Sequence, residues 1–305
     1  MTGPGSDAPG FRSGIVGVVG RPNVGKSTLV NAMVGQKVAI VSDKPQTTRR
    51  GVRGILTTDR FQIVFTDTPG FHKPRTQLGK RLNQAVADAV QGVDAVIQVV
   101  DAAAGVGRGD REVYIRRVRE VPSPKVCAVN KIDRLAHHAV VPQLARVADL
   151  GEFDEIVPVS AATGRGVPEL LDLVVARLPE GSPLYPVDQA TDQPMEARIA
   201  EIVREKALAL TREEIPHSIA VEVEELEVPP APEDGVVRIE ALVVVERDSQ
   251  KGIVIGRGGE MLKAIGTRAR EELEVVLQRR VFLSLRVKVL KDWQRDPRAL
   301  DRLGF

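Results

Sequence analysis

The chain has 305 residues, of which 43% are hydrophobic, 28% are charged and 3% are aromatic, and its formal net charge is +2. This composition excludes a disordered or collagen-like chain. The chain has no run of about eighteen apolar residues, so the sequence predicts no membrane-spanning helix. A single cysteine, Cys127, excludes an internal disulfide and predicts a reduced compartment. Residues 1–11 lack the pattern of a secretion signal and are expected to be disordered, so we expect a cytoplasmic protein. The length of the chain predicts two domains.

A glycine-rich segment follows an apolar strand pattern at 15–19 and precedes a helical pattern at 28–34. It matches the phosphate-binding loop, in which main-chain N–H groups at the start of a helix surround phosphate oxygens. Lys26 is the predicted catalytic cation that reaches the β- and γ-phosphates, and the Ser27 hydroxyl is a predicted Mg²⁺ ligand. The predicted nucleotide-binding residues of this segment are Gly20, Arg21, Pro22, Asn23, Val24, Gly25, Lys26, Ser27 and Thr28.

Residues 36–50 have neither a helical nor a strand period and are predicted to form a loop that contains Thr47 and Thr48. A threonine hydroxyl beside a phosphate site can complete the Mg²⁺ shell. The loop that carries it can then move when the γ-phosphate binds or leaves. Spacing alone leaves Thr47 and Thr48 both open. We take Thr48 as the predicted metal ligand and catalytic residue, with a plain solvated loop as the alternative.

Two strand patterns at 51–57 and 61–66 lead into Asp67-Thr68-Pro69-Gly70. A carboxylate at the end of a buried strand is the group needed to hold Mg²⁺, usually through water, so Asp67 is a predicted metal ligand. Gly70 allows its N–H to approach a γ-phosphate, because no side chain stands in the way, and we assign it a catalytic role. Asp67, Thr68, Pro69 and Gly70 all join the predicted nucleotide site.

Helix and strand patterns then alternate along the chain. The alternation predicts an α/β fold with a doubly wound sheet, and it places binding residues at the carboxyl ends of the strands. The predicted ranges are helices at 78–90, 111–119 and 140–150 and strands at 93–100, 125–129 and 156–159.

Asn130-Lys131-Ile132-Asp133 directly follows the strand at 125–129. The Asp133 carboxylate can accept from both the N1–H and the 2-amino group of guanine, which predicts GTP rather than ATP. Asn130 is expected to brace the loop or to contact the base, and the Lys131 stem is expected to cover the ring. Main-chain N–H groups after the next strand are expected to face guanine O6, which adds Ser160, Ala161 and Ala162.

Five prolines between 178 and 194 predict a linker at 179–194 that separates a domain at 12–178 from a second domain at 195–305. The second domain has a helix at 195–210, strands at 219–228 and 236–247, a glycine-rich turn, a helix at 261–277 and a strand at 281–290. This pattern predicts a smaller α+β domain with a basic C-terminal tail. Glu222, Glu224, Glu225 and Glu227 are interpreted as an exposed face without a ligand role.

Ile255-Gly256-Arg257-Gly258-Gly259 is typical of the Gly-x-x-Gly loop of KH domains, which lets a nucleic-acid backbone come close. The motif alone is weak and is commonly only a turn. Between residues 279 and 298, however, seven lysines and arginines stand against two aspartates, as phosphate binding requires. A solvated strand face is the alternative for that stretch. The predicted RNA-binding residues are Lys251, Ile255, Gly256, Arg257, Gly258, Gly259, Lys263, Arg286 and Lys288.

The four nucleotide motifs occur in the order seen in translation-factor-related GTPases, and this resemblance covers residues 12–178. With the KH module, the chain resembles bacterial ribosome-assembly GTPases from Gly14 to Lys291. The resemblance implies a type II KH domain and hydrolysis of GTP to GDP with Mg²⁺. It also implies binding to small-subunit ribosomal RNA near its 3′ end, a role in small-subunit assembly, and peripheral contact with the inner face of the cell membrane. We expect a monomer in which GTP repositions the KH module.

Phe71 follows Gly70, where a Ras-like enzyme has the glutamine that orients the attacking water. We therefore expect slow intrinsic hydrolysis that a partner, another residue or a monovalent cation accelerates. Asn23 resembles the residue that supports K⁺ activation in some relatives. An RNA-binding adaptor that keeps nucleotide only as a structural ligand is the alternative, and multiple-turnover phosphate release separates the two.

Overall fold

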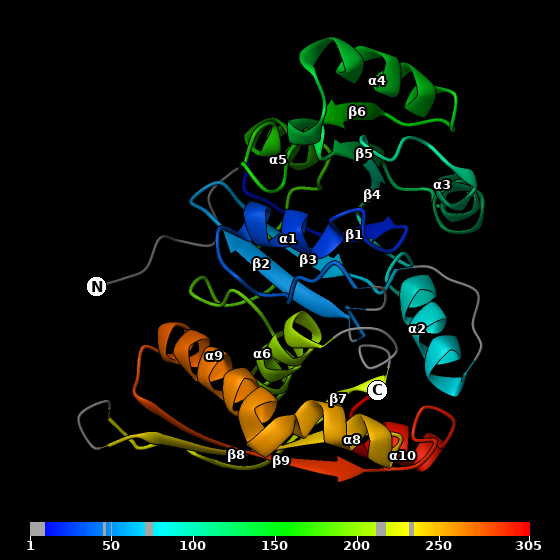
Figure 1. Cartoon of the computed structure of the whole chain (residues 1–305). Helices are drawn as coiled ribbons and strands as arrows, with labels where there is room; N and C mark the ends of the chain where they lie inside the picture. The colour runs from blue at the N-terminus through cyan, green and yellow to red at the C-terminus, as the bar shows by residue number, and fades with distance from the viewer. Residues whose placement is uncertain (1–9, 45–46, 50, 71–75, 212–217, 232–234) are drawn as a thin grey trace. The chain divides into compact units, whose positions relative to one another are not determined.

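The computed structural model describes residues 10–44, 47–49, 51–70, 76–211, 218–231 and 235–305. The chain forms two compact units, each with its own core (Figure 1). The first unit consists mainly of residues up to Asp192, and the second mainly of residues from Gln193 onward. The described residues 42–44, 47 and 76–78 group with the second unit. Phe71 and part of the 36–50 loop lie outside the described residues.

A six-stranded sheet forms the centre of the first unit, in the order β2-β3-β1-β4-β5-β6. β2 runs antiparallel to β3, and the other neighbouring strands are parallel. The expected α/β doubly wound fold is therefore confirmed. The strands are β1 (Arg12–Gly20), β2 (Val52–Thr57), β3 (Phe61–Asp67), β4 (Ala95–Asp101), β5 (Lys125–Asn130) and β6 (Glu155–Pro158).

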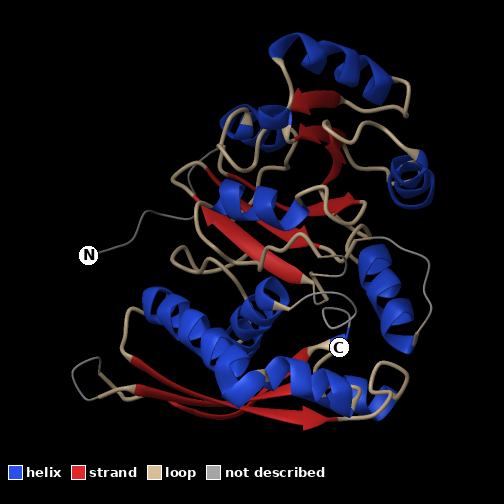
Figure 2. Cartoon of the chain, viewed as in Figure 1, coloured by secondary structure: helices blue, strands red, loops and turns tan. Residues whose placement is uncertain are grey.

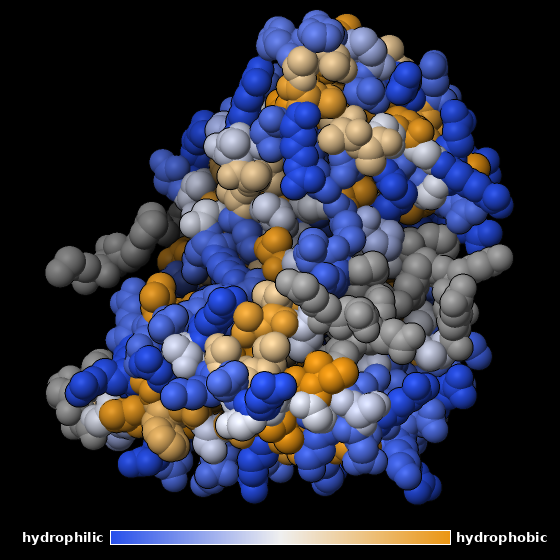
Figure 3. Space-filling model, viewed as in Figure 1, coloured by the Kyte–Doolittle hydropathy of each residue, from blue (hydrophilic) through white to orange (hydrophobic). Residues whose placement is uncertain are grey.

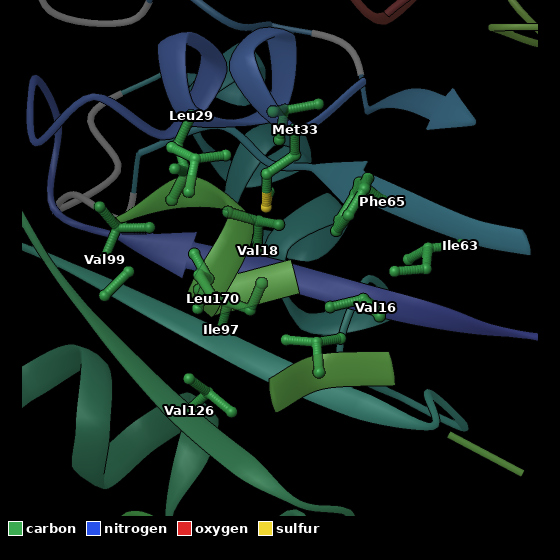
Figure 4. Packing of buried hydrophobic residues seen from close by; sticks show 14 of the residues in the cluster. Val16, Val18, Leu29, Met33, Ile63, Phe65, Ile97, Val99, Val126 and Leu170 are labelled. Atoms are coloured by element: carbon green, nitrogen blue, oxygen red, sulfur yellow. The ribbon is translucent and has the colours of Figure 1, made fainter. Parts of the chain in front are cut away.

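Helices cover both faces of this sheet, because successive residues of a strand point to opposite faces. Val16 and Val18 of β1 pack in one cluster with α1 (Lys26–Val34) and α5 (Val167–Val175), as Figure 4 shows. Val19 belongs to the cluster on the other face. That face is covered by α2 (Gln77–Asp88), by α3 (Arg108–Val113) with its π-helical continuation η1 (Tyr114–Val118), and by α4 (Val140–Ala148).

Most of the segment predicted as a linker packs on the first unit. Gln62 of β3 is completely buried, and its side-chain Oε1 accepts from the main-chain N–H groups of Leu184 and Tyr185 at 2.6 and 2.8 Å. Ile55 of the edge strand β2 donates its N–H to the carbonyl of Ala190 at 2.8 Å. The prolines of this segment therefore belong to an extended strap that satisfies a sheet edge.

The second unit contains a three-stranded sheet in the order β7-β8-β9 with helices on one face (Figures 1 and 2). β7 and β8 are antiparallel, whereas β8 and β9 are parallel. The helix-first order is that of a type II KH domain, as expected. The elements are α6 (Met195–Leu210), β7 (Ala220–Glu227), β8 (Val237–Val245), α8 (Asp248–Ile255), α9 (Glu260–Leu277), β9 (Val281–Val289) and α10 (Pro297–Arg302).

Two helices of this unit differ from the sequence interpretation. The expected glycine-rich turn after β8 contains α8, whose start is stabilised by the Gln250 side chain, which accepts from the N–H groups of Glu246 and Arg247 at 2.9 and 3.1 Å. The expected basic tail contains α10, where the Asp296 carboxylate accepts from the N–H of Arg298 at 2.9 Å. Local capping outweighs the glycine-rich composition of the first segment and the charged composition of the second.

The visible face of the molecule is mostly hydrophilic, with apolar residues in separate small areas (Figure 3). Within the described part of the chain, no helix has the length and apolar content needed to cross a membrane.

Candidate nucleotide and RNA sites

The phosphate-binding loop lies between β1 and α1, as the sequence predicted. Gly25 precedes α1 with φ at +95°, a left-handed conformation that favours glycine. A Cβ at this position would also collide with the Asn130 amide group. The loop is therefore closed against a residue from β5, and the N–H groups at the start of α1 are left to face a ligand.

Lys26 is the cation of this loop. Its side chain is buried, and Nζ donates to the carbonyls of Gly20 and Arg21 at 3.2 and 3.0 Å. Burial lowers the pKa of Lys26 to about 8, although the Asp67 carboxylate acts in the opposite direction. A phosphate group at this position would supply the negative charge that a buried ammonium group needs.

Ser27, Thr48 and Asp67 come together beside Lys26 and can hold Mg²⁺. Ser27 Oγ lies 2.6 Å from Asp67 Oδ2 and 2.9 Å from Thr48 Oγ1. Among the described residues, the buried Asp67 Oδ1 has no hydrogen-bond partner, and burial raises the pKa of Asp67. A hard cation fits these oxygen donors and would stabilise the charged carboxylate.

Thr47 and Thr48 differ clearly in their surroundings. The Thr48 hydroxyl joins Ser27 and Asp67, whereas the Thr47 hydroxyl donates to the carbonyl of Lys44 at 2.6 Å. Of these two threonines, Thr48 is the one placed to reach an ion held by Ser27 and Asp67, whereas spacing left both open.

The segment after β5 forms a second part of the site. Asn130 Nδ2 donates to the carbonyl of Val24, and Oδ1 accepts from the N–H of Ala161, both at 2.9 Å. The exposed Asp133 accepts from Ser160 Oγ at 2.5 Å. An exposed carboxylate held at a strand end can accept from the donors of a purine edge. Asn130 is therefore a brace, because both ends of its amide group are already used.

Lys131 links this segment to the phosphate-binding loop. It has a left-handed backbone with φ at +68°, and Nζ lies 2.5 Å from the carbonyl oxygen of Asn23. Nζ also lies 2.6 Å from Asp101 Oδ2 at the end of β4. The sequence interpretation did not include Asp101. An acidic residue after an apolar strand was a usable signal, the same one that identified Asp67.

Other predicted nucleotide-site residues have their side chains engaged elsewhere. Thr68 is buried and donates to the carbonyl of Val18 at 2.8 Å. Arg21 Nε donates to the buried Asp110 of α3 at 2.8 Å. These two residues can contribute to a nucleotide site through their main chains.

A groove of about 390 Å³ lies between α9 and β9 in the second unit. The loop between α8 and α9 borders it, with positive φ angles at Gly256, Gly258 and Gly259 and an exposed Arg257. Apolar leucines beside basic groups suit stacked bases and a phosphate backbone. The lining residues are Gly259, Leu262, Lys263, Gly266, Thr267, Arg270, Leu283 and Leu285.

Arg286 and Lys288 do not join this groove. Leu283 and Leu285 line it, so strand alternation directs Arg286 and Lys288 to the opposite face of β9. There Arg286 pairs with Glu224 at 2.8 Å. The sequence showed an excess of basic residues between 279 and 298, but the alternation of side chains along β9 places Arg286 and Lys288 on the face opposite the groove.

Comparisons with known proteins identify both domains. Residues 15–131 match the family model described as 50S ribosome-binding GTPase, and residues 214–294 match the KH domain model. The chain is 50% identical over 299 residues to GTPase Era of Mycobacterium avium (strain 104), covering 97% of this chain and 99% of the relative. It is 49% identical over 298 residues to GTPase Era of Mycobacterium tuberculosis (strain ATCC 25618 / H37Rv), with the same coverage.

Two solved structures are similar over nearly the whole chain, each with a TM-score of 0.92, 40% identity, and coverage of 96% of this chain and 99% of the other. One is a crystal structure of Era in complex with MgGDPNP and nucleotides 1506–1542 of 16S ribosomal RNA. The other is an Aquifex aeolicus Era variant bound to GDP and AlF₄⁻. With the phosphate-binding loop, the strand-end motifs and the KH domain all in place, this chain belongs to the Era family of GTPases.

Proposed function

We propose that this GTPase is a molecular switch that binds small-subunit ribosomal RNA near its 3′ end and acts in small-subunit assembly. The observation that carries the proposal is the presence on one chain of the Ser27, Thr48 and Asp67 cluster and the groove beside α9. The Era structure solved with MgGDPNP and a 16S ribosomal RNA segment supports it, because that protein is 40% identical over nearly the full length.

In the proposed nucleotide site, Lys26 and the N–H groups of the phosphate-binding loop hold the β- and γ-phosphates. Ser27, Thr48 and Asp67 would hold Mg²⁺, and the ion would supply positive charge beside the phosphate oxygens. Gly70 offers its N–H to the γ-phosphate. The Asp133 carboxylate selects guanine, and Lys131 covers the base.

We propose that K⁺ accelerates hydrolysis, because Phe71 offers no hydrogen bond to the attacking water and Asn23 resembles the residue that supports K⁺ activation in some relatives. Asn23 has φ at +63°, and its carbonyl oxygen already accepts from Lys131. K⁺ beside the phosphates would supply the positive charge that accelerates phosphoryl transfer. Hydrolysis should be faster in K⁺ than in Na⁺ at matched ionic strength, and Asn23→Ala should remove the difference. Equal rates in both salts for the unmodified protein would exclude K⁺.

A contact within the second unit supports coupling between nucleotide and RNA. The guanidinium of Arg204 in α6 is buried, pairs with Glu201, and donates to the carbonyl of Thr47, which belongs to the same unit. Thr48 is the next residue along the chain. A displacement of Thr48 on Mg²⁺–GTP binding would move the Thr47–Thr48 peptide group, whose carbonyl accepts from Arg204 of α6.

RNA binding measured in different nucleotide states tests this function. A short single-stranded RNA that matches the small-subunit 3′ end is titrated with the full chain and GTP analogue, GDP or no nucleotide. We expect tight binding only with the analogue. Thr48→Ala should abolish the nucleotide dependence, whereas Thr47→Ala, its matched control, should keep it. Equal RNA affinity in all three states would refute the switch.

We further propose that the protein works as a cytoplasmic monomer with peripheral contact to the membrane surface. Co-sedimentation with anionic and neutral lipid vesicles tests the contact, and sedimentation equilibrium tests the monomer. Recovery of all protein in the supernatant with both vesicles would exclude the contact.

A further inference from the structure

Asp101 occupies the carboxyl end of β4, next to the segment assigned to guanine recognition. Its strand partner is Asn130, and the N–H of the following residue, Ala102, donates to the Asn130 carbonyl at 2.8 Å. The carboxylate therefore lies at the sheet edge where ligands of doubly wound folds bind. The nucleotide roles proposed above leave it unused.

The two oxygens of Asp101 have separate partners. Oδ1 accepts from the N–H groups of Ala103 and Ala104 at 2.9 and 3.1 Å, which fixes the turn after β4. Oδ2 lies 2.6 Å from Lys131 Nζ. Because the turn immobilises the carboxylate, its second oxygen is a fixed anchor for the ammonium group.

Lys131 is held at both ends of its side chain. The backbone has the left-handed φ of +68°, and Nζ contacts Asp101 and the carbonyl of Asn23. The Lys131 and Asp101 side chains are only 20% and 12% exposed, so water screens this pair weakly. An otherwise mobile four-carbon stem is thus ordered before any ligand arrives.

We propose that Asp101 is a positioning residue for guanine nucleotide, which holds the Lys131 stem in the place where it covers the base. The inference rests on the proposed role of Lys131 in covering the guanine ring. Asp101 acts only through Lys131, and it does not touch the nucleotide. By ordering Lys131 in advance, it reduces the entropy cost of binding.

Affinity for GDP in a double-mutant cycle tests the inference, with the full chain, Asp101→Asn, Lys131→Met and the double variant. Asp101→Asn retains an oxygen for the two turn N–H groups but removes the charge that faces Lys131. We expect its GDP Kd to rise about tenfold, in keeping with the loss of one charge-assisted hydrogen bond. In the Lys131→Met background, Asp101→Asn should cause no further loss.

Glu155→Gln provides the matched control. Glu155 also pairs with a basic side chain, Arg177, at 2.6 Å, but it lies at the opposite end of its strand. We expect its GDP Kd to be unchanged. The thermal midpoint of each nucleotide-free variant reports any loss of folding stability separately.

The outcomes separate the inference from its premise. An unchanged Kd for Lys131→Met would overturn the role of Lys131 and this inference with it. A raised Kd for Lys131→Met together with an unchanged Kd for Asp101→Asn would overturn the inference alone. Equal losses from Asp101→Asn in the Lys131 and Lys131→Met backgrounds would also overturn it, because they would show that Asp101 only stabilises the turn.

Discussion

The side-chain amide of Asn130 donates to the main-chain carbonyl of Val24 at 2.9 Å and so joins the end of β5 to the phosphate-binding loop. Its oxygen accepts from the N–H of Ala161 at the same distance. One buried side chain therefore holds three segments that are distant in sequence. In the proposed site, this brace joins the segment assigned to guanine recognition to the phosphate-binding loop.

Asn130→Ala should weaken the nucleotide site and the fold together. The truncation leaves the Val24 carbonyl and the Ala161 N–H without partners in a buried place. We expect the free energy of unfolding to fall by about 2–6 kcal/mol, the sum of two unsatisfied groups at about 1–3 kcal/mol each. Urea titration measures this loss, and GDP titration should show Kd raised at least tenfold. Wild-type affinity in the variant would mean that the brace does not support the site.

Gly70→Ala should slow GTP hydrolysis at least tenfold. A Cβ on Gly70 would lie 2.7 Å from Pro22 Cα and 2.8 Å from Pro22 N, so the main chain of the phosphate-binding loop would have to move. Such displacements of reacting groups are costly in rate. Multiple-turnover phosphate release measures the effect. Gly252→Ala is the control, because its Cβ meets nothing within 4 Å; equal rates for the two variants would contradict the prediction.

Gly258→Asp should lose RNA binding without unfolding. A Cβ there meets nothing within 4 Å, and φ at +58° is a conformation that Asp and Asn tolerate. Gly258→Asn is the matched control, since it has the same shape without the charge that repels phosphate. We expect only the Asp variant to lose affinity, most strongly at low salt. Equal affinity for both variants would argue against a phosphate contact at this loop.

Gln62→Ala should release the strap formed by the predicted linker. The truncation removes the acceptor of the Leu184 and Tyr185 N–H groups and the donor to the Tyr185 carbonyl. We expect the free energy of unfolding to fall by about 2–4 kcal/mol, because the variant loses three hydrogen bonds that contribute about 0.5–1.5 kcal/mol each. Hydrogen exchange at Leu184 and Tyr185 should accelerate. Gln84→Ala, which removes an exposed bond to Asp88, should change stability by less than about 0.5 kcal/mol.

Cys127 should be inert to thiol reagents in the folded protein. Its side chain is completely buried in β5, and burial raises the thiol pKa, with the Asp110 carboxylate acting in the same direction. The folded state therefore holds the thiol proton more tightly than the unfolded chain does. That contribution to stability is present below the ordinary thiol pKa and is lost as the pH rises above it. Labelling at pH 8 should occur only in denaturant, and fast labelling of the native chain would contradict the prediction.

Local sequence determined the nucleotide-binding half of this protein to a large degree. The phosphate-binding loop follows an apolar strand, Asp67 and Asn130 each end one, and parallel strands bring their carboxyl ends to one edge of the sheet. We could therefore predict that these residues lie at the same edge of the sheet without knowing the order of the strands. The KH fold was also predictable, because the period of each element and the Gly-x-x-Gly loop are local features.

Tertiary structure alone decided the remaining relationships. Asp101 and Lys131 are separated by a helix and a strand, Gln62 contacts the strap 122 and 123 positions later, and the pleat of β9 turns Arg286 away from Leu285. Sequence periodicity tells which residues are buried, but it does not tell which buried polar groups will meet. Those pairings depend on the three-dimensional register of segments that the chain brings together only when it folds.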